Sequence, residues 1–505
     1  MIWRLLATAR CRTIEKNLRQ PGRTQRRLLQ RILQQLEGCQ IAQDLHINHA
    51  TDIESFRTTV PITDYSFYKQ YIEKILNGRR SVMFPGYPVC IAQTGGTTSG
   101  PKQIPLGKHL IRSYRQFNLD MAFCYMQDSG NYDILSDRIF LVVASPDAPL
   151  PVRNIPVGRA TGVMAQIAPW PLRRRYVPNM DVILNTNAKQ RIEQTTLHAL
   201  KHRKKIRMAA GLTPYLMAAF NNLLDRLHNN DLNDRTIYDI FPHLRVAFHG
   251  GTTFDLYSQK MKSLTGESIE HRNIYSAAEG PIAFQSMGSS QGLSPALDAV
   301  FFEFSPVAQL KSNSPSTVLL EEVECGVPYY IILTTQGGLL RYKIGDQVEF
   351  IETNPPLMRV LGRDEDQIDL SGEKLGVDDA IKALSLTADA HGLQISDFLV
   401  SPTVIDFKDK RIAHEWIIEC GSQPNDLWRF SEELEKALYE RNSRYRQLRD
   451  HDFSLGPPEI RFVDCGTFQR YMENELVYGQ QKLFHMHNDR LCADRILYYG
   501  QQYED

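Results

Sequence analysis

Short runs of β-branched, aromatic and leucine residues without polar alternation constrain the fold of this sequence most strongly. Such runs occupy residues 139–145 and 329–334, and a further β-rich run covers 317–324. A strand buried on both faces of a sheet has this pattern, whereas a half-exposed strand alternates apolar and polar residues. The segment 213–228 instead has apolar residues at helical spacing, with Thr213 at a suitable N-cap position. We therefore expect an α/β fold in which helices flank the sheets.

The length of the chain indicates more than one domain, because 505 residues are too many for one ordinary hydrophobic core. The last part has strand-like runs at 412–419 and 459–463 on either side of a helical segment, which is typical of a small α+β unit. A charged, glycine-containing stretch, GRDEDQIDLSGEKLG, precedes it, and domain boundaries favour such stretches. We predict a large domain over 1–362, a hinge over 363–376 and a small mobile domain over 377–505.

Charge balance and cysteine content argue against several classes of protein. Lys plus Arg and Asp plus Glu both number 58, and a chain without a basic surplus is a poor general nucleic-acid binder. The basic runs Arg173–Arg175 and Lys201–Lys205 are interpreted as solvated surface. None of the eight cysteines belongs to a CxxC pair, which favours a reducing compartment. We see no signal peptide or apolar run of about 20 residues, and expect a cytoplasmic monomer or weak homo-oligomer without nucleic-acid or membrane partners.

The segment Gln93–Pro105, QTGGTTSGPKQIP, is the most informative local motif. It contains three glycines, four hydroxyl residues and Lys102. Glycines allow the backbone to approach a phosphate closely, while N–H groups, hydroxyls and an ammonium group bind its oxygens. The segment is not a GxxxxGK[ST] loop, because no GK[ST] follows the glycines. It predicts a different phosphate-binding loop, and the alternative of a flexible loop tip would not require the lysine.

Two further motifs each follow a strand-like run. FHGGTT, at 248–253, places two glycines at the carboxyl end of a strand, where ligands of α/β proteins usually bind. YSAAEG, at 275–280, offers Tyr275 for stacking on a purine and Glu279 as an oxygen ligand for Mg²⁺. Taken singly, a tight turn explains the first motif equally well, and a surface glutamate explains the second one better.

Two last motifs lie towards the predicted hinge. In LRYKIGD, at 340–346, Asp346 follows a glycine and can accept hydrogen bonds from both hydroxyls of a ribose. In GRDEDQIDLSG, at 362–372, Arg363 can reach a phosphate or a ribose. A hairpin turn is the alternative for the first of them.

In this order, the five motifs resemble those of the adenylate-forming superfamily, which includes acyl-CoA ligases and luciferase. Within it, the chain most closely resembles the Gretchen Hagen family of acyl-acid–amido synthetases. This resemblance rests on FRTTVPITDYSFYKQYIEKILNG (56–78), GPPEIRFVDCGTFQRYM (456–472) and GQQKLFHM (479–486), and it covers about residues 50–490. The chain departs from the family where YSAAE replaces Y-A-S-S-E and where KLFHM lacks the Val-Pro-Arg that often follows the late lysine.

The resemblance implies that the enzyme uses ATP and Mg²⁺ to convert a carboxylic acid into an acyl-adenylate. It implies that Tyr275 packs against the adenine, that Asp346 binds the ribose and that Glu279 binds Mg²⁺. It assigns the ATP phosphates and the rest of the nucleotide to Thr94, Gly95, Gly96, Thr97, Thr98, Ser99, Lys102, Gly251 and Thr252. Arg363 and Lys482 are expected to close on the α-phosphate, with the hinge at Glu365 and Asp366.

The acyl pocket is expected near 158–170 and the helix over 213–228. Met164, Tyr215 and Met217 are candidate lining residues, although methionines and aromatics at helical spacing also pack in ordinary cores. His249 lies beside the GG turn and is a candidate for the pocket or for a general base, with a packing histidine as the alternative.

Three functions remain open from the sequence. The first is transfer of the acyl group to an amine such as an amino acid, which forms an amide. The second is thioester formation with coenzyme A after the same adenylation step. The third is a non-catalytic nucleotide-binding protein, and the presence of Lys102, Glu279, Asp346 and Lys482 together argues against it.

Overall fold

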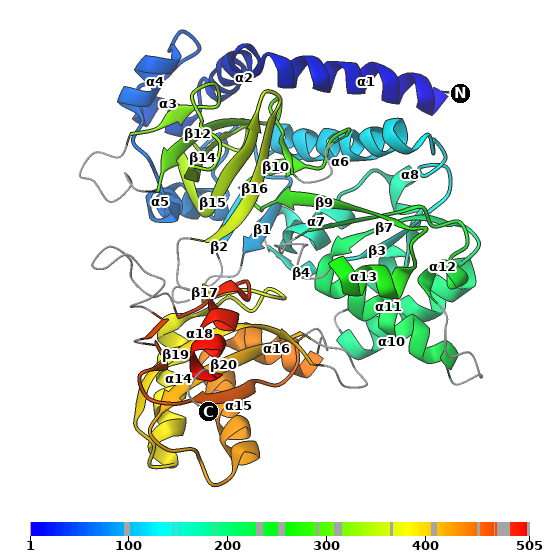
Figure 1. Cartoon of the computed structure of the whole chain (residues 1–505). Coiled ribbons are helices and arrows are strands. Elements are labelled where there is room, and N and C mark those ends of the chain that lie inside the picture. The colour runs from blue at the N-terminus through cyan, green and yellow to red at the C-terminus, as the bar shows by residue number, and fades with distance from the viewer. Residues whose placement is uncertain are drawn as a thin grey trace. The chain divides into compact units, whose positions relative to one another are not determined.

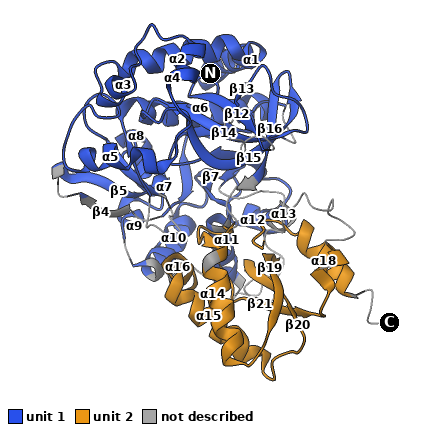
Figure 2. Ribbon diagram, turned by 90° about the vertical axis from the view of Figure 1, so that its left-hand side faces the viewer, with its two compact units in different colours: residues 1–94, 102–364 blue, residues 95–101, 365–505 orange. Residues whose placement is uncertain are grey.

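The computed structural model describes residues 2–94, 102–144, 146–150, 152–185, 187–228, 236–250, 258–288, 292–307, 316–363, 367–405, 412–451, 455–468, 470–471 and 485–501. These residues form two compact units (Figure 2). The first unit holds the described residues up to 363, and the second holds those from 367 onward. Sheets flanked by helices confirm the predicted α/β class (Figure 1).

The first unit begins with a group of helices, and capping residues fix the starts of two of them. Asp52 and Asp64 accept hydrogen bonds from the N–H groups of Ser55 and Ser66, and so cap two of these helices. The helices are α1 (Ile2–Arg19), α2 (Pro21–Leu36), α3 (Gln40–Asp44), α4 (Ile53–Thr59), α5 (Tyr65–Leu76) and α6 (Lys108–Ser129). Helix α1 packs along α6 (Figure 1), so the amino-terminal helix belongs to the core of this unit.

A four-stranded sheet carries the two ends of the glycine-rich segment. Its strands are β1 (Cys90–Thr94), β2 (Lys102–Leu106), β4 (Pro146–Leu150) and β5 (Ile155–Arg159), in the order β2-β1-β5-β4, and η1 (Val152–Asn154) and α7 (Ala160–Gln166) flank β5. Thr94 pairs with Lys102 across the antiparallel β1–β2 pair. Gln93 pairs with Arg159 across the parallel β1–β5 pair, so Arg159 lies beside the end of β1.

A seven-stranded sheet follows, in the order β11-β10-β9-β8-β7-β3-β6. Its strands are β3 (Arg138–Val142), β6 (Tyr176–Val177), β7 (Ile206–Leu212), β8 (Val246–Gly250), β9 (Glu270–Ser276), β10 (Pro281–Phe284) and β11 (Ser294–Pro295). The helices around it are α8 (Trp170–Arg173), α9 (Met180–Ile183), α10 (Ala188–His202), α11 (Thr213–His228), α12 (Ile237–Ile240) and α13 (Ser258–Thr265). Strands β6, β3, β7, β8 and β9 are parallel, so their carboxyl ends share one edge of the sheet.

The third sheet is antiparallel and carries the LRYKIGD motif. Its strands, in the order β13-β12-β14-β15-β16, are β12 (Val300–Pro306), β13 (Val318–Leu319), β14 (Pro328–Thr335), β15 (Tyr342–Thr353) and β16 (Pro356–Arg363). Asp346 pairs with Arg363 across β15 and β16. The predicted strand over 317–324 is wrong beyond Leu319, because the Glu322 carboxylate accepts the N–H of Leu319 at 2.7 Å and closes a turn.

The second unit is a small α+β structure. Its elements are β17 (Gln367–Ile368), β18 (Leu375–Gly376), α14 (Val377–Ala390), β19 (Ile395–Val404), β20 (Ile412–Cys420), α15 (Leu427–Arg441), α16 (Ser443–His451), β21 (Glu459–Val463) and α18 (Leu491–Gln501). A fully buried Glu373 carboxylate lies 2.8 Å from Nε2 of His414 and accepts the N–H groups of Leu370 and Ser371. This contact joins Glu373, in the second half of the predicted hinge stretch 363–376, to β20.

A buried ion pair joins the amino-terminal helices to the third sheet. Arg341 donates two hydrogen bonds of 2.9 Å to the two carboxylate oxygens of Glu303, and both side chains are less than a tenth exposed. The same guanidinium donates to the backbone oxygen of Val60 at 2.7 Å. Nε of Arg57 lies 3.4 Å from Glu303, so a second cation shares the carboxylate. Because Arg341 immediately precedes β15, this network fixes where that strand begins.

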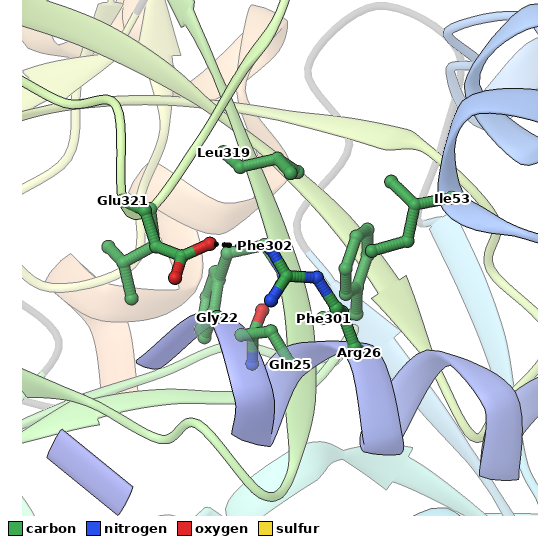
Figure 3. Close-up of a pocket in the computed structure, with 9 residues that line it drawn as sticks. Gly22, Gln25, Arg26, Ile53, Phe301, Phe302, Leu319 and Glu321 are labelled. Carbon is green, nitrogen blue, oxygen red and sulfur yellow. Dashed lines mark hydrogen bonds and ion pairs between the residues drawn. The ribbon is translucent and has the colours of Figure 1, made fainter. Parts of the chain in front are cut away.

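An exposed ion pair offers a contrast on the same unit. Figure 3 shows Arg26 of α2 beside Glu321, at 3.0 Å, in a small hollow between α2 and the third sheet. The two side chains are 57% and 41% exposed. Gly22 approaches the Glu321 carboxylate so closely that a Cβ atom there would lie 1.9 Å from it. The hollow therefore depends on a glycine and holds a solvated ion pair.

We predict that Arg341→Met destabilises the first unit by roughly 3–5 kcal/mol, because it leaves the Glu303 carboxylate buried without its bidentate partner. Arg26→Met is the matched control, and it should cost about 1 kcal/mol or less because that pair is exposed. Urea unfolding of both variants checks this. Equal losses would contradict the role given to Arg341.

Candidate active site

The residues predicted for adenine and ribose meet in the structure. The hydroxyl of Tyr275, on β9, donates a hydrogen bond to Oδ2 of Asp346, on β15. Asp346 is 5% exposed, and Tyr275 is half-buried. Two motifs from different sheets, 71 residues apart, therefore form one contact. It lies near the carboxyl ends of the parallel strands, because Ile274, directly before Tyr275, pairs with Gly250 at the end of β8.

Glu279 lies in a bend after β9 that a tyrosine holds in place. The N–H of Ala277 donates to the oxygen of Gly280 at 3.1 Å, and the Tyr114 hydroxyl donates to the oxygen of Ala277. Glu279 is 6% exposed. Burial first, and then the charge of Glu279, raise the pKa of both Tyr114 and Tyr342 well above its ordinary value. The carboxylate thus faces two neutral phenols.

The surroundings of Glu279 fit a magnesium ligand. Within the described ranges, its carboxylate makes no hydrogen bond or ion pair with the protein, although it is almost completely buried. A mostly buried carboxylate without a protein partner is available to a cation as an oxygen ligand. The described residues contain no group of three or more His, Cys, Asp or Glu side chains arranged for a metal ion. Mg²⁺ at this position would therefore need phosphate oxygens as further ligands, which is its usual habit in nucleotide sites.

Lys102 is the first residue of β2. Two residues near it, Asp64 and Tyr65, belong to the segment 56–78 on which the family resemblance partly rests, which we call the signature segment. The Lys102 ammonium nitrogen lies 5.9 Å from the ring centroid of Tyr65. Asp64 is also near Lys102. The pKa of Asp64 is lowered mainly by a hydrogen bond from the Ser66 hydroxyl and, more weakly, by the positive charge of Lys102. The sequence interpretation missed Asp64 and Tyr65 as site residues, although both lie in a segment that had been recognised as characteristic.

The candidate acyl-binding residues have different surroundings. Tyr215, in the first turn of α11, accepts a hydrogen bond of 3.1 Å from Arg159, at the end of β5. Arg159 was not predicted, and it brings a cation next to the end of β1. Met164 is partly buried against the apolar cluster around α7. Met217 is 3% exposed, and its burial favours the core-packing alternative.

His249 is unsuited to act as a base. It is completely buried, and its ring centroid lies 5.5 Å from that of His271. Burial and the neighbouring imidazole lower the pKa of His249 to about 3. Burial also lowers the pKa of His271 to about 4. A general base works best with a pKa near the operating pH, so we interpret His249 as a packing residue.

Several predicted residues lie outside the described part of the chain. These are Gly95, Gly96, Thr97, Thr98, Ser99, Gly251, Thr252, Glu365, Asp366 and Lys482. For Thr94 and Arg363 only the backbone is described, at the ends of β1 and β16. Their roles remain predictions.

Comparison with known proteins identifies relatives along almost the whole chain. The GH3 family N-terminal domain matches residues 10–226, the central domain matches 294–363 and the C-terminal domain matches 377–490. The indole-3-acetic acid-amido synthetase GH3.3 of Arabidopsis thaliana is 23% identical over 93% of this chain and 89% of its own length. The jasmonoyl–L-amino acid synthetase JAR4 of Nicotiana attenuata is 24% identical over 91% of this chain and 89% of its own length.

A solved structure shares the fold. It is that of AtGH3.15, an acyl acid amido synthetase in complex with 2,4-DB, with a TM-score of 0.61 and 18% identity. The match covers 97% of this chain and 95% of the other.

Among the described helices, none is long and apolar enough to cross a membrane.

We predict that the first unit loses stability below about pH 6.5 because of the buried histidine pair. Both imidazoles have a lowered pKa in the folded protein, about 3 and about 4, so the unfolded chain takes up protons that the folded one does not. The contribution of these histidines to the free energy of unfolding is fully present above their pKa in the unfolded chain. It is lost as the pH falls towards their pKa values in the folded protein. His249→Gln should reduce the loss between pH 7 and pH 5 by about 2 kcal/mol, measured by urea unfolding. An unchanged pH dependence would contradict this prediction.

Proposed function

The chain belongs to the GH3 (Gretchen Hagen) family, and we propose on this basis that it is a ligase that activates a carboxylic acid with ATP and transfers the acyl group to an amine. The observation that carries the proposal is the meeting of Tyr275 with Asp346 beside the buried Glu279. These side chains offer an aromatic ring for adenine, a carboxylate for ribose hydroxyls and a cation ligand for the phosphates.

In the first step, an oxygen of the substrate carboxylate attacks the α-phosphorus of ATP. The bond between that phosphorus and the oxygen of the β-phosphate breaks, and pyrophosphate leaves. Because the reactants supply the bonds that change, the work of the protein is positioning and charge stabilisation. Asp346 would orient the ribose and Lys102 would bind phosphate oxygens. Glu279 would hold Mg²⁺, which supplies positive charge at those oxygens.

In the second step, the nitrogen of an amine attacks the acyl carbon and loses a proton to solvent, the bond from that carbon to the AMP oxygen breaks, and AMP leaves. We assign Arg363 and Lys482 to the α-phosphate during the first step. Glu365 and Asp366 are the hinge about which the small domain swings before the second step. An amino acid is the favoured amine. Two relatives that match about nine tenths of the chain are named an indole-3-acetic acid-amido synthetase and a jasmonoyl–L-amino acid synthetase. Coenzyme A is the alternative acceptor.

We also propose that the protein works in the cytoplasm as a monomer or weak homo-oligomer, without nucleic-acid or membrane partners. All eight cysteines are free thiols, which suits a reducing compartment. The formal net charge of zero does not suit a nucleic-acid binder.

We predict that Glu279→Gln lowers ATP–pyrophosphate exchange by roughly 10²–10³-fold, because it removes the charge that would hold the cation. The variant should also need more Mg²⁺ for half-maximal exchange. Glu37→Gln is the control, since that side chain is 52% exposed and, among the described residues, pairs only with His49. Exchange by Glu279→Gln at the wild-type rate and the wild-type Mg²⁺ requirement would contradict the assignment.

We predict that a competition reaction yields amides. The enzyme receives ATP, Mg²⁺, a panel of acids, a mixture of amino acids and coenzyme A, and the products are identified by mass. Acyl-amino acids are the expected products. Thioesters without amides would overturn the acceptor assignment, and absence of any acid-dependent exchange would overturn the enzyme itself.

A further inference from the structure

Helix α5 presents three tyrosines towards three different parts of the first unit. Tyr65, Tyr68 and Tyr71 are spaced three residues apart, which places neighbours in this series on adjacent positions of the helix surface. The rings of Tyr68 and Tyr71 are neighbours, with their centroids 6.5 Å apart. Each hydroxyl has a different partner. The partner of Tyr65 lies on β2, which carries Lys102. The partner of Tyr68 is Leu340, two residues before β15, which carries Asp346.

Tyr65 holds the phosphate end. Its hydroxyl accepts a hydrogen bond of 2.9 Å from the N–H of Gln103, the second residue of β2. Its ring faces the ammonium group of Lys102, the first residue of that strand, at 5.9 Å. The helix start itself is fixed, because Asp64 caps it through the N–H groups of Ser66 and Phe67. Tyr65 thus connects a rigid helix terminus to the strand that begins with the phosphate-binding lysine.

Tyr68 binds the backbone just before β15, the strand that carries the proposed ribose ligand Asp346. Its hydroxyl accepts the N–H of Leu340 at 2.7 Å and donates to the oxygen of the same residue at 2.9 Å, and the side chain is completely buried. Thr63, just before the helix, adds backbone bonds: its N–H donates to Arg341 at 2.9 Å, and it accepts from Lys343 at 2.8 Å. These contacts fix the start of β15 at Tyr342, four residues before Asp346.

The two strands belong to separate sheets, and no strand of the described chain joins those sheets by hydrogen bonds. ATP must nevertheless reach Lys102 and Asp346 at the same time, and a small misplacement of such groups costs much of the rate. We propose that α5 sets the spacing between the phosphate-binding and ribose-binding strands, and that Tyr65 and Tyr68 are positioning residues for ATP. This inference rests on the proposed function, because it takes Lys102 and Asp346 as nucleotide contacts.

The chain offers a matched control on the same helix. The Tyr71 hydroxyl donates to Asp44, on α3, at 3.1 Å, and within the described ranges it makes no hydrogen bond with β2 or β15. Tyr65→Phe and Tyr71→Phe each remove one hydroxyl and keep the ring. Loss of one such hydrogen bond corresponds to roughly a 3–10-fold change in an equilibrium constant. Melting temperatures show whether either variant is generally destabilised.

The test measures the affinity of full-length variants for ATP and for AMP by calorimetry. Tyr65→Phe should bind ATP roughly 3–10-fold more weakly while its affinity for AMP, which lacks the β- and γ-phosphates, changes little. Tyr68→Phe should weaken both ligands, because the ribose contact is common to them. Tyr71→Phe should bind both like the wild type.

Two results would overturn the inference: Tyr65→Phe and Tyr71→Phe with the same affinities, or losses for ATP and AMP that are equal and follow the fall in melting temperature. Failure of the proposed function gives a different result. A wild-type protein that binds ATP but shows no acid-dependent pyrophosphate exchange would refute the function, and the ATP-to-AMP comparison would still decide the role of α5. A wild-type protein that binds neither nucleotide would refute both.

Discussion

The first unit depends on the buried contact between Arg341 and Glu303. A carboxylate at 1% exposure is tolerable only with charged and hydrogen-bonding partners, and here the partners come from segments far apart in the chain. Arg341 spans 38 residues to reach Glu303 and 281 to reach the backbone of Val60. The amino-terminal signature segment therefore cannot move independently of the strand that carries Asp346. This family segment is far from Asp346 in sequence, yet it supports the strand that carries Asp346.

The proposed site is assembled at places where separate sheets approach one another. Lys102 belongs to the four-stranded sheet, Tyr275 to the seven-stranded sheet and Asp346 to the antiparallel sheet. Tyrosine hydroxyls supply most of the described links: Tyr275 to Asp346, Tyr114 to the bend of Glu279, and the two tyrosines of α5. A tyrosine joins a large apolar contact to one directed hydrogen bond, so it can pack in the core and fix a backbone at the same time.

The fold class predicted from the sequence is confirmed, and the site residues proposed from it stay predictions, whereas the contacts that support them could not be predicted. Tyr275, Glu279 and Asp346 could be found because the chemistry of nucleotide binding selects their residue types. The bond from Tyr68 to Leu340 spans 272 residues and ends on backbone atoms, which any residue could provide, so no residue type marks it. The strand predicted at 317–324 failed for a local reason, since Glu322 bonds the backbone of Leu319 and turns the chain. Burial, which argues against His249 as a base, is likewise a property of the fold and not of its motif.

The central claim is that the acid is activated as an acyl-adenylate, and isotope transfer tests it most directly. The substrate acid is labelled with ¹⁸O in its carboxylate and converted with ATP and an amino acid. In this account, one carboxylate oxygen becomes bonded to the α-phosphorus and stays there when the amine breaks the acyl–oxygen bond. AMP should therefore carry one ¹⁸O atom for each amide formed, while pyrophosphate carries none. Label found in inorganic phosphate, with ADP as the nucleotide product, would show activation through an acyl phosphate and would contradict the account.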